Sequence, residues 1–155
     1  MTTRMLHYVL LAGLALAATG CLSMAAPDRF LITHKGSGEI QAVAADDSRL
    51  LVREFDDEHG GELSYWIETL RKEFTDNRGY TLIGERPVQD ARGRHGWEGL
   101  FEVTMGGATW RYLLTVSVRE GFGSRKVRCV EFVAQKDAFD EHLDAVREAA
   151  AGIDP

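Results

Sequence analysis

The segment from residue 97 to residue 119 places the strongest constraint on the fold, because it has the pattern of a β-hairpin. Adjacent Gly106 and Gly107 suit a two-residue primed turn, in which both central residues need positive φ and glycine alone reaches it without a Cβ penalty. The two arms are rich in Val, Thr, Phe, Tyr and Trp, which fit a half-buried pleated surface. A turn of this length sets the pairing register of the arms.

That register gives the hairpin two unlike faces. One face is apolar, with Phe101 opposite Tyr112, Val103 opposite Trp110 and Trp97 opposite Val116. The other face is mostly polar, carries Leu100 opposite Leu113, and sets Glu102 across from Arg111; its polar members are Glu98, Glu102, Thr104, Thr109, Arg111 and Thr115. We therefore predict that the hairpin is the centre of an antiparallel sheet with one face covered.

Shorter strand patterns surround the hairpin. Turn signals at residues 36–38 and 46–47 separate three of them, and a fourth ends at Arg86-Pro87 before a polar loop at residues 88–96. A fifth follows the glycine-containing turn at residues 120–124. The predicted strands are residues 30–33, 39–44, 49–55, 80–85 and 125–134.

Two segments have the period of amphipathic helices. The first has an apolar stripe, ends at Gly79 and should pack Trp66 against the sheet; the stripe is Leu63, Trp66, Ile67, Leu70 and Phe74. The second, residues 137–151, aligns Phe139, Leu143, Val146 and Ala150. Helices are too few for a doubly wound parallel sheet. The fold class predicted is α+β, an antiparallel sheet with amphipathic helices packed on it.

The first 20 residues have the order of a secretory signal, with Arg4 near the start and an apolar run at residues 8–18 that is too short to span a bilayer. The residues Ala18-Thr19-Gly20-Cys21 resemble the lipobox of bacterial lipoproteins, which implies acylation, including palmitate, at Cys21. A competing cut after Ala26 would give a soluble secreted protein. The predicted organisation is a signal peptide at residues 1–20, a short tether at 21–28 and one α+β domain at 29–155.

Lipidation implies an anchor in the membrane of the cell envelope. By resemblance to Gram-negative lipoproteins, Leu22 in place of Asp after the cysteine implies the outer membrane, facing the periplasm. The formal net charge of −6 argues against nucleic acid as a partner. With Cys21 acylated, Cys129 has no disulfide partner, and its apolar-leaning strand indicates a buried, unreactive thiol.

Three polar clusters are candidate sites. Asp56-Asp57-Glu58-His59 could hold a cation, although its spacing matches no metal loop and a solvated acidic loop is the preferred interpretation. The polar loop could bind an anion through Arg92, Arg94 and His95, with a solvated loop again preferred. The candidate interaction patch is Arg119, Arg125, Lys126 and Arg128, whose other interpretation is protection of a strand edge.

No catalytic motif is present in the sequence. It lacks a Gly-x-Ser-x-Gly elbow, a His-Glu-x-x-His pair and a phosphate-binding glycine loop, so we predict no enzymatic activity, no cofactor and no metal. The scattered histidines are interpreted as surface residues, namely His34, His59, His95 and His142.

Over residues 62–153 the order of elements resembles the PsbP-like superfamily, which includes DcrB-type envelope lipoproteins and Ran-binding Mog-type proteins. The resemblance implies a non-catalytic domain that acts through protein contacts. The expected function is therefore a lipid-anchored binding or assembly module of the cell envelope. The alternatives are a protein that holds a small apolar ligand between the sheet and the first helix, and an envelope hydrolase.

Overall fold

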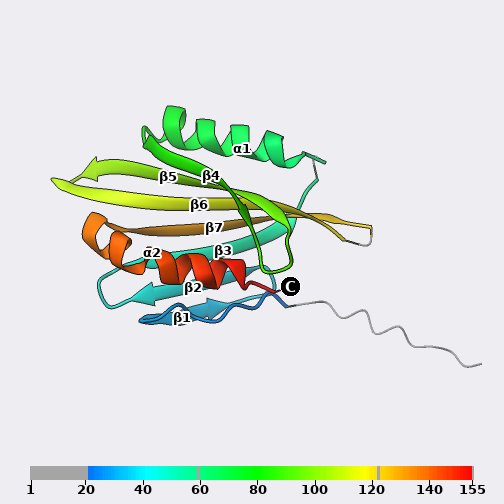
Figure 1. Ribbon diagram of the computed structural model, residues 1–155, viewed down its shortest axis with the longest axis horizontal. Helices are drawn as coiled ribbons and strands as arrows, with labels where there is room; N and C mark the ends of the chain where they lie inside the picture. The colour runs from blue at the N-terminus through cyan, green and yellow to red at the C-terminus, as the bar shows by residue number, and fades with distance from the viewer. Residues whose placement is uncertain (1–20, 59, 122, 155) are drawn as a thin grey trace, which may run out of the picture.

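One antiparallel sheet of seven strands forms the centre of the protein (Figure 1). The computed structural model describes residues 21–58, 60–121 and 123–154. The strands lie in the order β1-β2-β3-β7-β6-β5-β4. Their bounds are β1 Phe30–Lys35, β2 Glu39–Ala44, β3 Arg49–Asp56, β4 Thr81–Gln89, β5 His95–Met105, β6 Ala108–Glu120 and β7 Arg125–Gln135.

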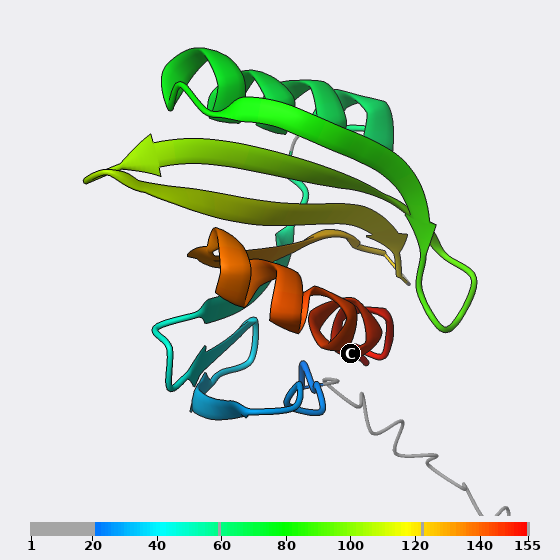
Figure 2. The same ribbon diagram turned by 60° about the vertical axis from the view of Figure 1, so that its left-hand side comes forward.

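The two helices lie on opposite faces of this sheet, as Figure 2 shows. Helix α1 spans Leu63–Lys72 and continues as the π-helical turn η1, Glu73–Asn77, whereas α2 spans Lys136–Ala151. Adjacent residues of β5 contact the two helices on opposite faces of the sheet. The ring of Trp97 packs against the guanidinium of Arg71 in α1, and Glu98 forms an ion pair with Arg147 of α2. Successive strand side chains point to opposite faces, so the sheet separates two cores.

The predicted register of the central hairpin is confirmed. Phe101 pairs with Tyr112, and Glu102 pairs with Arg111, whose Nε donates to Glu102 Oε2 at 3.1 Å. Gly106 and Gly107 have φ of 59° and 79°, the conformation that a primed turn requires.

The prediction that only one face of the sheet is covered is wrong. The polar face of the hairpin lies under α2, where Arg111 also binds Asp140 at 2.6 Å and Glu98 is only 2 % exposed. Arginines from other elements neutralise the carboxylate of Glu98, and this makes its burial tolerable.

A valine at position 107 is expected to destabilise the protein. Gly107→Val places a β-branched residue at positive φ and should cost about 1–2 kcal/mol of unfolding free energy. Ala108→Val is the matched control, because residue 108 is already in the ladder opposite Met105, and it should change stability by less than about 0.5 kcal/mol. Urea denaturation measures both, and equal effects would contradict the turn geometry.

Each face has its own apolar core. The core beneath α1 is aromatic: Phe74 of η1 is 2 % exposed and lies 4.9 Å from Phe101 between ring centroids. The core beneath α2 includes Phe132, which stacks on Phe139 at 4.8 Å. Trp66, predicted to pack against the sheet, is half-buried and packs against this first core, beside the exposed ring of Phe55.

Strand β4 continues through Pro87, so the prediction that Arg86-Pro87 ends this strand is wrong. The strand lies at the edge of the sheet, where proline can be accommodated because an edge strand pairs on one side only.

Residues 22–24, within the segment predicted as a short tether, lie against the domain. Leu22 and Met24 are 1 % and 7 % exposed, in the core beneath α2. The backbone of Ser23 exchanges two hydrogen bonds with Asp154, at 2.8 and 3.0 Å. The apolar side chains at alternate positions account for this docking, because burying them removes apolar surface from water.

Candidate functional site: an arginine cluster and a cavity under α2

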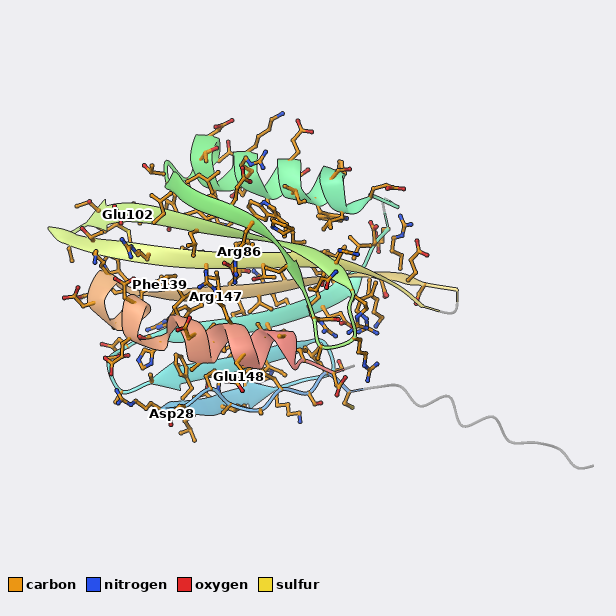
Figure 3. The ribbon with its side chains drawn as sticks, viewed as in Figure 1. Asp28, Arg86, Glu102, Phe139, Arg147 and Glu148 are labelled. Atoms are coloured by element: carbon orange, nitrogen blue, oxygen red, sulfur yellow. The ribbon has the colours of Figure 1, made fainter. Side chains whose placement is uncertain are left out.

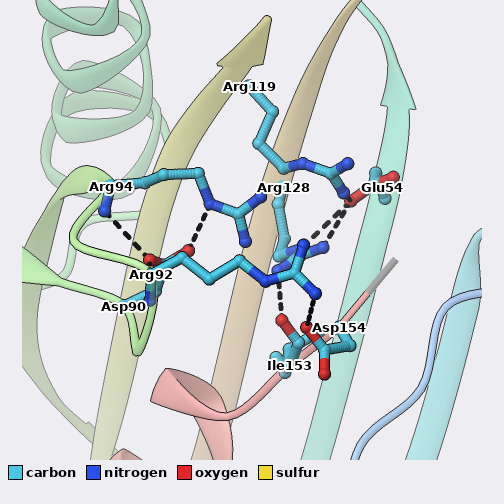
Figure 4. A network of polar contacts seen from close by, with 8 residues as sticks. All are labelled: Glu54, Asp90, Arg92, Arg94, Arg119, Arg128, Ile153 and Asp154. Carbon is cyan, nitrogen blue, oxygen red and sulfur yellow. Dashed lines mark hydrogen bonds and ion pairs between the residues drawn. The ribbon is translucent and has the colours of Figure 1, made fainter. Parts of the chain in front are cut away.

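Three members of the candidate interaction patch, Arg119, Lys126 and Arg128, meet at one buried carboxylate, that of Glu54. Figure 4 shows the two arginines at this carboxylate. Glu54 Oε2 accepts from Arg119 Nη1 at 2.7 Å and from Arg128 Nε and Nη2 at 3.0 and 2.8 Å, and Lys126 Nζ is 3.9 Å from Oε1. The strand register explains this convergence. Glu54 of β3 pairs with Arg128 of β7, and Arg119 of β6 pairs with Lys126 of β7. Residues 126 and 128 alternate with 127 on β7, so these side chains lie on one face of the sheet.

The hypothesis that Arg119, Arg125, Lys126 and Arg128 form one open surface patch does not fit these positions. Arg128 is 4 % exposed and also donates to the Ile153 carbonyl at 3.0 Å. Arg125 points to the opposite face, where it binds Glu120 at 2.6 Å. Burial, together with the charges of Arg119 and Arg94, lowers the pKa of Arg128, and Glu54 offsets only part of that effect.

The loop between β4 and β5 is organised by Asp90. Its Oδ1 accepts the backbone N–H groups of Arg92 and Arg94, both at 2.9 Å, and its Oδ2 accepts Arg94 Nε at 2.5 Å. Burial alone would raise the pKa of Asp90, but the hydrogen bonds from Arg94 and Arg92 outweigh burial and lower it. The second terminal nitrogen of Arg94, Nη2, is buried and has no hydrogen-bond partner in the described part of the chain.

A second buried carboxylate, Glu98, links the sheet to α2. Arg86 and Arg147 each donate two hydrogen bonds to it, at 2.6 to 3.2 Å. These arginines come from β4 and α2 and are labelled in Figure 3. Burial would raise the pKa of Glu98, but the two guanidinium groups lower it below its ordinary value, so the carboxylate stays ionised.

A cavity of about 310 Å³ lies beside the carboxylates of Asp90 and Glu98, bounded by the β4–β5 loop, β5, β6 and the C-terminal end of α2. Its lining includes the hydroxyls of Thr115 and Ser117 and the apolar side chain of Leu113. Six charged residues also line it: Arg86, Asp90, Arg94, Glu98, Arg128 and Arg147. The cavity is on the α2 face, whereas the sequence-based alternative expected one beneath the first helix.

The remaining candidates are separate from this cavity. His142 was expected at the surface but is 4 % exposed, with Nε2 at 2.7 Å from Asp46. His59, part of the acidic segment, lies outside the described residues, as does the signal segment 1–20. Within the described ranges, no three His, Cys, Asp or Glu side chains are grouped so that they could hold a metal ion. None of the helices described is long and apolar enough to cross a membrane.

The two cysteines differ in environment, since Cys21 is exposed and Cys129 is buried. Burial, with the charge of Glu131, raises the pKa of Cys129 to about 12, so its thiol stays neutral at pH 8. In unacylated protein at that pH, we expect a disulfide reagent to modify Cys21 alone until urea is added, because the thiolate is the nucleophile. Cys129→Ala should leave the native reaction unchanged and remove the urea-dependent one. Equal reaction of both thiols in native protein would contradict the buried position.

Comparison with known proteins shows similarity of fold. No family model matches the sequence, and no curated protein matches it. Among solved structures, LpqN of Mycobacterium tuberculosis, described as involved in cell envelope biogenesis, aligns with a TM-score of 0.68 and 14 % identity over 86 % of this chain and 83 % of its own. The Ran-binding protein Mog1p of Saccharomyces cerevisiae aligns with a TM-score of 0.58 and 11 % identity over 89 % of this chain and 92 % of its own.

A Pseudomonas aeruginosa protein of unknown function aligns with a TM-score of 0.56 and 10 % identity, over 88 % of this chain and 98 % of its own. Identities this low are evidence for a shared α+β architecture and leave function to be argued from the residues themselves.

Proposed function

We propose that this protein is a lipid-anchored module of the bacterial cell envelope that acts by binding through protein contacts. The description of LpqN as an envelope biogenesis protein supports the location, and the similarity to Mog1p supports a PsbP-like order of elements. The signal-like order of residues 1–20, ending at Cys21, supports acylation of that cysteine.

The observation that carries this proposal is the contrast between Cys21 and its neighbour. Cys21 is exposed, and Leu22 is 1 % exposed in the core. The residue that follows the acylated cysteine therefore belongs to the folded domain, and acyl chains on Cys21 would hold the domain directly at the membrane surface. Each buried CH₂ contributes about 0.8 kcal/mol, so two or three chains make a stable anchor.

Of the two alternatives that the sequence left open, ligand binding is supported by a specific observation, the cavity under α2. Its lining includes six charged side chains, which disfavours a purely apolar ligand. The outer membrane, facing the periplasm, is the proposed location, because Leu22 rather than Asp follows the cysteine.

Fractionation of bacterial cells tests the anchor. Wild-type protein should sediment with the outer membrane and leave it only with detergent, whereas Cys21→Ala should abolish fatty-acid labelling and membrane residence. Cys129→Ala is the matched control, since it removes the other cysteine and should leave labelling unchanged. Labelling that persists in Cys21→Ala, or wild-type protein that is soluble, would overturn the proposal.

A further inference from the structure

The cavity under α2 has an excess of positive charge in an otherwise acidic protein. Four arginines and two carboxylates line it, although the full chain has a formal net charge of −6. A positive site with low-dielectric walls concentrates anions, because the surrounding protein screens its field less than water does.

The two lining carboxylates do not neutralise all four arginines. Glu98 accepts the hydrogen bonds of Arg86 and Arg147 and so balances that end of the cavity in part. Asp90 accepts a hydrogen bond from Nε of Arg94, and Nη2 of Arg94 is buried without an acceptor among the described residues. A buried donor of this kind is costly unless something binds it.

The other end of the cavity is also short of negative charge. Arg128 has a side chain only 5 % exposed, and it shares the single carboxylate of Glu54 with Arg119. Figure 4 shows the Arg94 guanidinium directed towards Arg128, and the two are close enough for the charge of Arg94 to lower the pKa of Arg128. Two guanidinium groups arranged in this way suit an oxyanion, which each can bind through paired N–H donors.

We propose that this cavity binds a small organic oxyanion, with its charged oxygens between Arg94 and Arg128 and its uncharged part towards Leu113 and Ala150. The hydroxyl of Ser117, on the same lining, can donate a further hydrogen bond. A volume of about 310 Å³ is at the small end of ligand sites, so the ligand is a compact one. This site is independent of the membrane anchor and goes beyond the proposed function.

Calorimetric titration of the full-length processed protein in detergent, in a low-salt buffer, tests the site. The probes are inorganic phosphate, phenyl phosphate and benzoate; the last two share a ring and distinguish a phosphate from a carboxylate head. We expect saturable binding with a stoichiometry of one for at least one ring-bearing probe, tighter than for inorganic phosphate.

Arg94→Gln is the decisive variant and Arg92→Gln its matched control. Both remove one positive charge from the same loop, but Arg92 is outside the cavity lining and pairs with Asp154 at 2.6 Å. Loss of a charge-assisted hydrogen bond should weaken binding about tenfold or more in Arg94→Gln, with little change in Arg92→Gln. Equal weakening in both variants, or no saturable binding of any probe, would overturn the proposal.

A second variant decides the matter if Arg94→Gln fails to fold. Ala150→Leu enlarges a side chain in the cavity wall and leaves every charge in place. Binding should weaken about tenfold or more if the ligand occupies this space. Unchanged affinity in a folded Ala150→Leu protein would place the binding elsewhere and overturn the assignment.

Discussion

Replacing Glu54 by alanine is expected to lower the free energy of unfolding by about 3–5 kcal/mol, because the change leaves a buried guanidinium without its carboxylate. The side chain of Glu54 is 8 % exposed and that of Arg128 is 5 % exposed, so water cannot easily replace the lost hydrogen bonds. Arg119 and Lys126 would lose the same counter-ion. Urea denaturation of the purified variant measures the loss.

The control for this variant is Glu120→Ala. Glu120 also pairs with an arginine, Arg125, at 2.6 Å, but its side chain is 78 % exposed. Exposed pairs contribute little, so this variant should lose less than about 1 kcal/mol. Similar losses in both variants would mean that the Glu54 cluster is hydrated and contributes no more than a surface pair.

The burial of Glu54 and Arg128 limits what charge reversal in the candidate interaction patch can show about partner binding. Reversing Arg125, Lys126 and Arg128 together to glutamate would place a negative charge beside Glu54 at the buried position 128. Loss of a partner in that triple variant would therefore follow from unfolding as readily as from a lost contact.

Leu22→Ala should destabilise the domain by about 2–5 kcal/mol, the range for a leucine removed from a core. Leu31→Ala is the matched control, because Leu31 is 70 % exposed on β1 and the same chemical change there should cost less than about 0.5 kcal/mol. Thermal or urea unfolding compares the two. If Leu22→Ala is as stable as Leu31→Ala, residues 21–28 are a free tether after all.

The position of Leu22 also separates the two expected cleavage sites. A cut after Ala26 would remove both Leu22 and Met24 from the core beneath α2, together with the backbone pairing of Ser23 with Asp154. A cut before Cys21 keeps all of these contacts. The packing therefore supports the proposed cut before Cys21 over a cut after Ala26.

Local patterns were sufficient to predict most of the strands. The alternation of apolar and polar residues and the Gly106-Gly107 turn were sufficient to predict the register of the central hairpin. A two-residue turn fixes which residue of one arm lies opposite each residue of the other. The same local reasoning stopped β4 too early at Pro87, because the edge position that accommodates this proline depends on the order of all seven strands.

The cavity was beyond sequence reasoning because its residues come from distant elements. Glu98 was assigned to an exposed face, since no local pattern indicates that Arg147, 49 positions later, returns to neutralise it. Asp90 and Arg94 were within one predicted loop, and their spacing was a usable signal for the capped turn that the structure contains. The buried Nη2 of Arg94, which has no hydrogen-bond partner in the described ranges, follows from the three-dimensional packing and from no sequence pattern.

The mass of the N-terminal peptide, measured on protein isolated from bacterial cells, shows directly where the chain is cut and whether it is acylated. We expect a mature chain that begins at Cys21 and carries acyl chains on that cysteine. A mature chain that begins at Pro27 without acyl groups would contradict this expectation.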